Sequence, residues 1–130
     1  MAKADEGDGI RDYRDLKAWQ EARILVKSVY LATRAFPKEE LFGLTQQIRR
    51  AAISVPSNIA EGYGRGSRKD YVRFLQVARG SLYEVQCQLL LGEDLGYLQA
   101  TQSAPAHERV NRCARLFHGL ISSLTKDREG

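Results

Sequence analysis

Apolar residues along the first third of the chain recur at alternating spacings of four and three, and this pattern constrains the fold more than any other feature. It is a heptad pattern, which places its members on one face of an α-helix that packs against other helices. The members are Ala18, Ala22, Leu25, Val29, Ala32 and Phe36. Beside this face, Trp19, Val26 and Tyr30 form a second apolar stripe. The helix, expected over residues 15–36, therefore has more apolar surface than a single neighbouring helix can cover.

A second helix is expected from about residue 41 to residue 62 or 64, with its apolar face at the same helical spacing. Pro56 lies inside it. Because proline lacks an N–H group and crowds the preceding turn, we predict a kink over residues 52–56 and not a break into two helices.

The third helix has a recognisable start. Ser67 and Asp70 have the spacing of a capping box, with Asp in place of the usual Glu or Gln, so this helix should run from residue 68 to about residue 96. Gly80 lies in its middle, where glycine costs roughly 1 kcal/mol relative to alanine. A close crossing of another backbone is a plausible compensation for that cost.

The fourth helix is expected to start after Ser103, with Pro105 in its first turn. Short connections make successive helices antiparallel neighbours. The predicted fold is therefore all-α, an antiparallel up-down-up-down four-helix bundle with a proline-kinked second helix. We expect the bundle over residues 13–125, with flexible segments at residues 1–12 and 126–130.

Composition narrows the function only slightly. The net charge of +4 permits an anionic partner such as nucleic acid without requiring one. The start of the chain lacks the apolar stretch of a signal peptide, and no run is long enough to span a membrane, so a cytoplasmic location is expected. Cys87 and Cys113 lack a C-x-x-C partner, and we expect both to be reduced core residues.

Five polar residues of the second helix fall within one narrow arc beside its apolar face: Gln47, Arg50, Ser54, Asn58 and Glu61. They form either a solvated flank or a partly buried network at a subunit contact or ligand groove. In the second case Arg50 and Glu61 need partners from other segments, since about 16 Å separates them at 1.5 Å rise per residue.

A basic cluster follows, made of Arg65, Arg68, Lys69 and Arg73. It surrounds a glycine-rich turn and the start of the third helix, where free N–H groups favour phosphate. Tyr63 and Tyr71 flank the cluster and could stack on unpaired bases. The alternative interpretation is an ordinary charged surface.

The sequence has no recognised catalytic signature. It lacks the motifs of P-loop nucleotide binding, zinc proteolysis and serine hydrolysis. The histidines and cysteines do not fall on one helix face at ligand spacing. We therefore expect no catalysis, no metal and no cofactor.

Five stretches resemble the four-helix bundle family related to 23S rRNA intervening-sequence proteins. They are RDLKAW (14–19), FPKEE (36–40), FGLTQQIRRAAISVPSNIAEG (42–62), RFL (73–75) and GSLYE (80–84). The long central stretch makes the resemblance specific, and the resemblance covers residues 12–98.

The resemblance implies a small bacterial bundle, encoded in some cases within an insertion in the 23S rRNA gene. The chain is also similar to the accessory variability protein of diversity-generating retroelements, a pentameric barrel that binds nucleic acid and works with a reverse transcriptase. The family motif falls here on Arg49, Arg50, Asn58, Glu61 and Gly62. Membership assigns no reaction.

Together these observations predict a non-catalytic oligomer, a pentamer by resemblance, that binds RNA or DNA. The alternative is an interaction scaffold or accessory subunit, for example of a reverse transcriptase, without nucleic-acid contact. The expected nucleic-acid-binding residues are Arg49, Arg65, Arg68, Lys69 and Arg73. The residues expected at the subunit interface or in a polar network are Trp19, Gln47, Arg50, Asn58 and Glu61.

Overall fold

The computed structural model describes residues 9–129, with side chains through residue 126. Its long helices are α1 (Lys17–Thr33), α2 (Leu44–Gly64), α3 (Arg68–Asp94) and α4 (Ala100–Glu129). Two short 3-10 turns, η2 (Tyr13–Asp15) and η3 (Lys38–Glu40), precede α1 and α2. The described residues contain no strand, and the predicted all-α four-helix bundle is confirmed.

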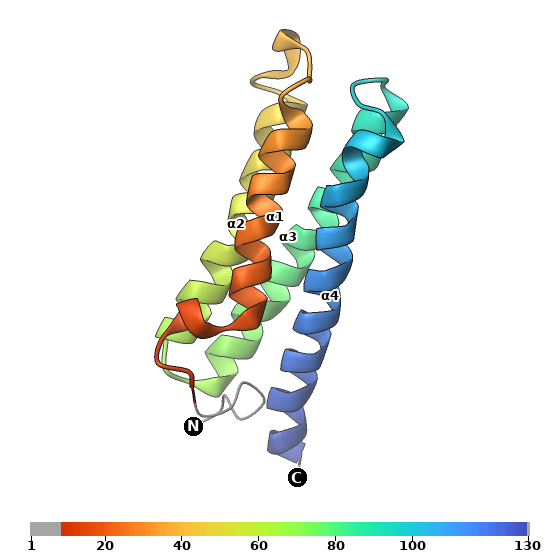
Figure 1. Ribbon diagram of the computed structural model, residues 1–130. Coiled ribbons are helices and arrows are strands. Elements are labelled where there is room, and N and C mark those ends of the chain that lie inside the picture. The colour runs from red at the N-terminus through yellow and green to blue at the C-terminus, as the bar shows by residue number, and fades with distance from the viewer. Residues whose placement is uncertain (1–8, 130) are drawn as a thin grey trace.

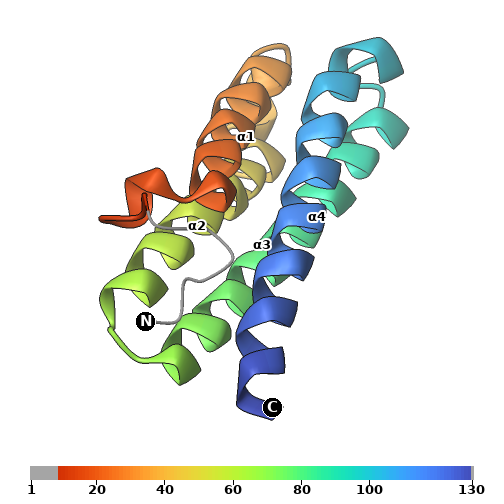
Figure 2. The ribbon, with the colours of Figure 1, turned by 60° about the horizontal axis from the view of Figure 1, so that its bottom comes forward.

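Each long helix packs against two others. α1 and α3 both contact α2 and α4, and η2 packs against α1 and α2. The α1–α2 and α3–α4 connections lie at one end of the molecule in Figure 1, and the α2–α3 connection lies at the other end with the end of α4. Figure 2 shows the α1–α2 pair beside the α3–α4 pair.

The core is built from the apolar faces that the heptad pattern predicted. Ala18, Ala22, Leu25 and Val29 of α1 are at most 1% exposed, and Phe117 of α4 is fully buried. Burial of a large apolar side chain contributes about 1.5–3 kcal/mol relative to exposure, so these faces account for much of the fold's stability.

Helix α1 ends at Thr33, three residues before the expected end at residue 36. The chain then closes a turn in which the Phe36 N–H donates to the Thr33 carbonyl at 3.1 Å. Phe36 is 8% exposed, and its ring lies 5.4 Å from the ring of Tyr97. It therefore belongs to the core, although it lies outside the helix.

Helix α2 continues through Pro56 without interruption, and the kink expected there stays a prediction. Helix α3 begins at Arg68 as predicted, because the Ser67 hydroxyl accepts a hydrogen bond from the Asp70 N–H at 3.1 Å. The backbone crossing expected at Gly80 is wrong within this chain. A Cβ added at Gly80 would meet no atom within 4 Å.

Helix α4 begins at Ala100 and not after Ser103 as expected. The Gln102 side chain accepts the Gln99 N–H at 2.6 Å, while Ser103 is buried and donates to Glu93 of α3 at 2.5 Å. Pro105 consequently lies in the second turn. The helix extends to Glu129, beyond the expected boundary at residue 125.

The flexibility predicted for residues 1–12 and 126–130 stays a prediction. Residues 1–8 and 130 lie outside the described residues.

Candidate functional site

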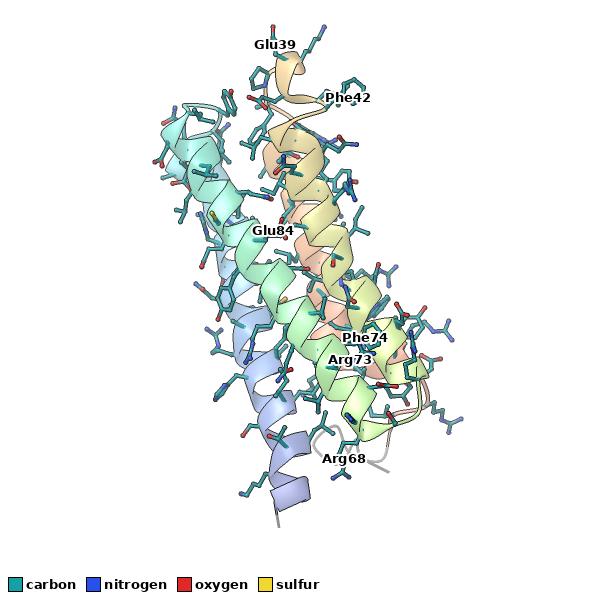
Figure 3. The ribbon with its side chains drawn as sticks, turned by 180° about the vertical axis from the view of Figure 1, so that it is seen from behind. Glu39, Phe42, Arg68, Arg73, Phe74 and Glu84 are labelled. Atoms are coloured by element: carbon teal, nitrogen blue, oxygen red, sulfur yellow. The ribbon has the colours of Figure 1, made fainter. Side chains whose placement is uncertain are left out.

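The polar residues of α2 face α3 across an open cleft of about 320 Å³. The cleft is lined by Gln47, Arg50, Ala51, Ser54, Ser81 and Glu84. Glu84 is labelled in Figure 3, which shows it on the side of α3 that faces α2. Three members of the helical arc that the sequence indicated, Gln47, Arg50 and Ser54, thus line one wall of a cleft, and the third helix supplies the other wall.

Hydrogen bonds organise one end of this cleft. The Ser54 and Ser81 hydroxyls lie 2.9 Å apart, and the Asn58 amide donates to both the carbonyl and the hydroxyl of Ser54 at 2.8 Å. Asn58 therefore acts within its own helix and positions the serine that joins α2 to α3.

The charged side chains of the cleft are left available. Arg50 is exposed and forms no ion pair with any described residue. Across the cleft, the exposed Glu84 carboxylate receives one long contact, from the Gln88 amide at 3.5 Å. A positive and a negative side chain thus stand at one surface without an ionic partner in this chain's described part.

Glu61 departs from the expectation. Its carboxylate pairs with Arg65 at 2.8 Å, one turn further along, so its partner does not come from a separate segment. This hydrogen bond raises the Arg65 pKa above its ordinary value. The pair is half exposed, which limits its contribution to stability.

Arg49 is turned toward α1 and away from Arg50. Its Nε donates to the Thr33 hydroxyl at 2.9 Å, and its guanidinium carbon lies 4.4 Å from the centre of the Tyr30 ring. Arg49 therefore joins α1 to α2. The structure separates it from the basic cluster with which the sequence grouped it.

Trp19 lies on α1 and does not line the cleft. Its half-buried ring meets the Tyr13 ring edge-to-face at 5.2 Å, and the Arg23 guanidinium carbon lies 5.4 Å from its centre. These contacts fix η2 against the start of α1.

The basic cluster forms one end of the bundle, around the α2–α3 turn, as Figure 3 shows for Arg68 and Arg73. Arg65 and Arg73 both lie against the Phe74 ring, with guanidinium carbons 5.0 and 4.5 Å from its centre. Arg73 also pairs with Asp70 at 3.5 Å. Lys69 is exposed and Arg68 is partly exposed.

Stacking of bases on the two tyrosines of this region is not supported. Tyr71 is 2% exposed, and its ring meets that of Tyr63 edge-to-face at 5.9 Å. Burial raises the pKa of the half-buried Tyr63, with Asp12 and Asp15 adding to the effect. The aromatic pair belongs to the core.

The two cysteines occupy different environments. Cys113 is buried, and burial raises the pKa of its thiol to about 12. Cys87 is exposed, so its expected place in the core is wrong; both thiols are free. Within residues 9–126, no three His, Cys, Asp or Glu side chains gather as a metal site would require.

A second pocket, of about 280 Å³, lies on the other side of α2, where α1 and the α1–α2 connection meet it. We call it the corner pocket. It is lined by Tyr30, Leu41, Phe42, Thr45, Gln46, Arg49, Arg50 and Ile53. Phe42 is 84% exposed and Figure 3 shows it beside Glu39 at the end opposite the basic cluster.

Sequence reasoning missed the corner pocket. The available signal was Leu41-Phe42, two large apolar residues next to a glycine and outside both helical faces. The described helices include none with the length and apolarity needed to cross a membrane.

A search of curated proteins found no match to the chain. The 23S rRNA-intervening sequence protein family matches residues 14–119, which include the cleft, the corner pocket and the basic cluster. The chain belongs to the 23S rRNA-intervening sequence protein family.

Proposed function

We propose that this protein is a non-catalytic, cytoplasmic homo-oligomer that binds RNA or DNA through the basic cluster at one end of the bundle. The observation that carries this proposal is the placement of Arg65, Lys69 and Arg73 as exposed cations around the start of α3. Helix N-termini favour phosphate, and several cations on one rigid turn can contact successive phosphates.

Two of the cations have carboxylate partners, which reduces but does not remove the positive field. Side-chain exposures of 47% for Arg65 and 57% for Arg73 leave both accessible to a phosphate. Exposed pairs are worth little, so exchanging a carboxylate for a phosphate costs little. Lys69 has no ion pair with any described residue.

Oligomer formation is supported by the apolar surface that the bundle leaves uncovered. Phe42, Leu41 and Ile53 are 84%, 51% and 43% exposed, and all three line the corner pocket. Large contiguous apolar patches mark protein contacts. The pentameric number rests on the resemblance to the accessory variability protein.

The same surface supports the second candidate function, a scaffold or accessory subunit that docks on another protein, such as a reverse transcriptase. In that case the basic cluster is ordinary surface. Salt dependence separates the two functions, because phosphate contacts release counterions and an apolar docking contact does not.

The experiment measures affinity for structured RNA, single-stranded RNA and duplex DNA at several salt concentrations. The test variant is Lys69→Gln/Arg73→Gln, and the matched control Arg34→Gln/Lys38→Gln removes the same charge at the opposite end. We expect only the test variant to bind more weakly. The slope of its log affinity against log salt concentration should fall by an amount that corresponds to about two lost phosphate contacts. Equal binding by both variants would rule out the basic cluster as the nucleic-acid site, and no binding by the parent would leave the scaffold as the function.

A further inference from the structure

The corner pocket combines apolar walls with one unsatisfied polar group. Tyr30, Leu41, Phe42 and Ile53 contribute its apolar surface. Thr45 also lines it, is 4% exposed, and its hydroxyl oxygen has no hydrogen-bond partner among the described residues. A buried hydroxyl without a partner is unfavourable, so a ligand with an apolar body and a hydroxyl would suit this pocket.

Helix α3 of the same protein presents a side chain of this kind. Tyr83 is 49% exposed, and it is the one tyrosine in the exposed class within residues 9–126. Tyrosine supplies a rigid apolar ring with a hydroxyl at its tip, and it is enriched at protein interfaces for that reason. Tyr83 does not line either pocket of its own chain.

The surroundings of Tyr83 suit the approach of another helix. Gly80 lies one turn earlier, is exposed, and has open space where a Cβ would stand. Glycine inside a helix lowers its stability, and no described residue of this chain packs closely enough at Gly80 to compensate for it. A neighbouring backbone that approaches at Gly80 would supply the compensation.

Charge is complementary between Glu84 and the rim of the corner pocket, where Arg50 lies between that pocket and the cleft. The exposed Glu84 follows Tyr83 directly, and its carboxylate has no ion pair among the described residues. The exposed Arg50 lines the corner pocket and likewise has no ion pair there. When α3 of a second copy places Tyr83 in the pocket, it also brings the Glu84 carboxylate to the rim, where the Arg50 guanidinium has no ion pair with any described residue.

We propose that the corner pocket of one copy receives Tyr83 of a second copy, with Gly80 permitting close approach of α3 and Glu84 pairing with Arg50. The contact rests on the proposed oligomer and specifies how it is built. Pocket and tyrosine are different surfaces of one chain, so the contact is heterologous. Such contacts link copies head to tail and form a ring when the rotation closes.

A second copy fits these observations better than a nucleic acid does. The exposed residues at the pocket are mainly apolar, and the acidic Glu39 lies beside Phe42 at the same end of the molecule. A phosphate would pair with Arg50, but it would also meet that acid and would gain nothing from the apolar walls. A tyrosine side chain uses the walls, the free hydroxyl and the unpaired arginine together.

Complementation of two defective copies tests the proposal. Tyr83→Asp removes the inserted side chain and keeps the pocket, whereas Ile53→Arg blocks the pocket and keeps the tyrosine. Both positions are exposed, so both variants should keep the parent's circular dichroism and monomer melting temperature. We expect each alone to sediment as a monomer and an equimolar mixture to form heterodimers, since one intact contact remains in the mixture.

A finer test uses Tyr83→Phe, which removes only the hydroxyl. It should weaken assembly about tenfold in the parent and leave assembly unchanged in a Thr45→Val background, because the two hydroxyls then no longer meet. Gly80→Ala should raise the monomer's melting temperature and weaken assembly. The control Arg115→Ala, on α4, should change neither.

The outcomes separate this inference from the proposed function. A Tyr83→Asp variant that still assembles like the parent overturns the Tyr83 contact and leaves an oligomer with some other interface. A parent that is monomeric at concentrations on the order of tens of micromolar overturns both the oligomer and this contact. If Ile53→Arg abolishes RNA binding while the variant keeps the oligomer mass of the parent, the corner pocket is a base-binding site and the proposal is wrong.

Discussion

Replacement of Arg49 by alanine should destabilise the bundle, whereas the same change at the adjacent Arg50 should leave the monomer's stability nearly unchanged. The two arginines have the same chemistry and lie one residue apart. They differ in partners, since Arg49 contacts Thr33 and Tyr30 of α1 and Arg50 has no ion pair with any described residue.

The magnitude follows from the two contacts of Arg49. A hydrogen bond from a charged donor contributes about 1.5–3 kcal/mol, and a partly exposed cation–π contact contributes about 0.5–1 kcal/mol. The Thr33 hydroxyl still donates to the Val29 carbonyl at 2.8 Å, so the change leaves no unpaired donor. Because Arg49 is half exposed, we take the lower end and expect a loss of about 2 kcal/mol.

Urea unfolding, followed by circular dichroism at several protein concentrations, measures this difference. Arg49→Ala should lose about 2 kcal/mol at every concentration, equivalent to about 6–10 °C in melting temperature for a chain of this size. Arg50→Ala should stay within about 0.5 kcal/mol at low concentration and lose stability only where the parent assembles. Arg49→Ala combined with Thr33→Val isolates the hydrogen bond as a coupling of about 1.5 kcal/mol. Equal stability of both single variants at all concentrations would refute the reasoning.

Three further outcomes are expected. Gly62→Ala should lower the free energy of unfolding by about 1–3 kcal/mol, because its Cβ would lie 2.5 Å from a side-chain carbon of α3, while Gly64→Ala meets nothing within 4 Å and serves as control. In native protein only the exposed thiol should react with a thiol reagent, and Cys113, whose pKa burial raises to about 12, should react only after unfolding. Hydrogen bonds from the Leu44 N–H and the Tyr97 hydroxyl hold the Glu40 pKa below its ordinary 4.5. The stability that the ionised Glu40 carboxylate contributes above pH 4.5 is therefore lost on acidification. Tyr97→Phe should make this loss smaller in acid titrations of unfolding.

The fold was largely predictable because periodicity reports which residues a helix must bury. The heptad positions of α1 and the start of α3 at Arg68 follow from spacing and capping chemistry alone. The start of α4 does not. Ser103, two residues before Pro105, is of a type that often caps helices, but its hydroxyl donates a hydrogen bond to Glu93 of α3.

The candidate site was predictable only where it depends on one helix. The common face of Gln47, Arg50 and Ser54 follows from 100° per residue, and these three side chains line the cleft together. The different surroundings of Arg49 and Arg50 could not be inferred, since they depend on the register between α1 and α2. The contact proposed for Tyr83 depends on which surfaces the folded bundle leaves uncovered, and helical periodicity does not report this.

The rigidity of the corner pocket depends on a contact that spans the chain. Gly43, the residue before α2, has no side chain with which to cap the helix, and the Glu40 carboxylate accepts the Leu44 N–H at 3.0 Å instead. A Cβ at Gly43 would lie 2.7 Å from that carboxylate, so glycine is what allows Glu40 to reach. The other Glu40 oxygen accepts the Tyr97 hydroxyl at 2.7 Å, which fixes the carboxylate to the α3–α4 connection. Thr45 and Phe42 flank this cap, and the shape of a pocket made by α1 and α2 is therefore held in place by the opposite pair of helices.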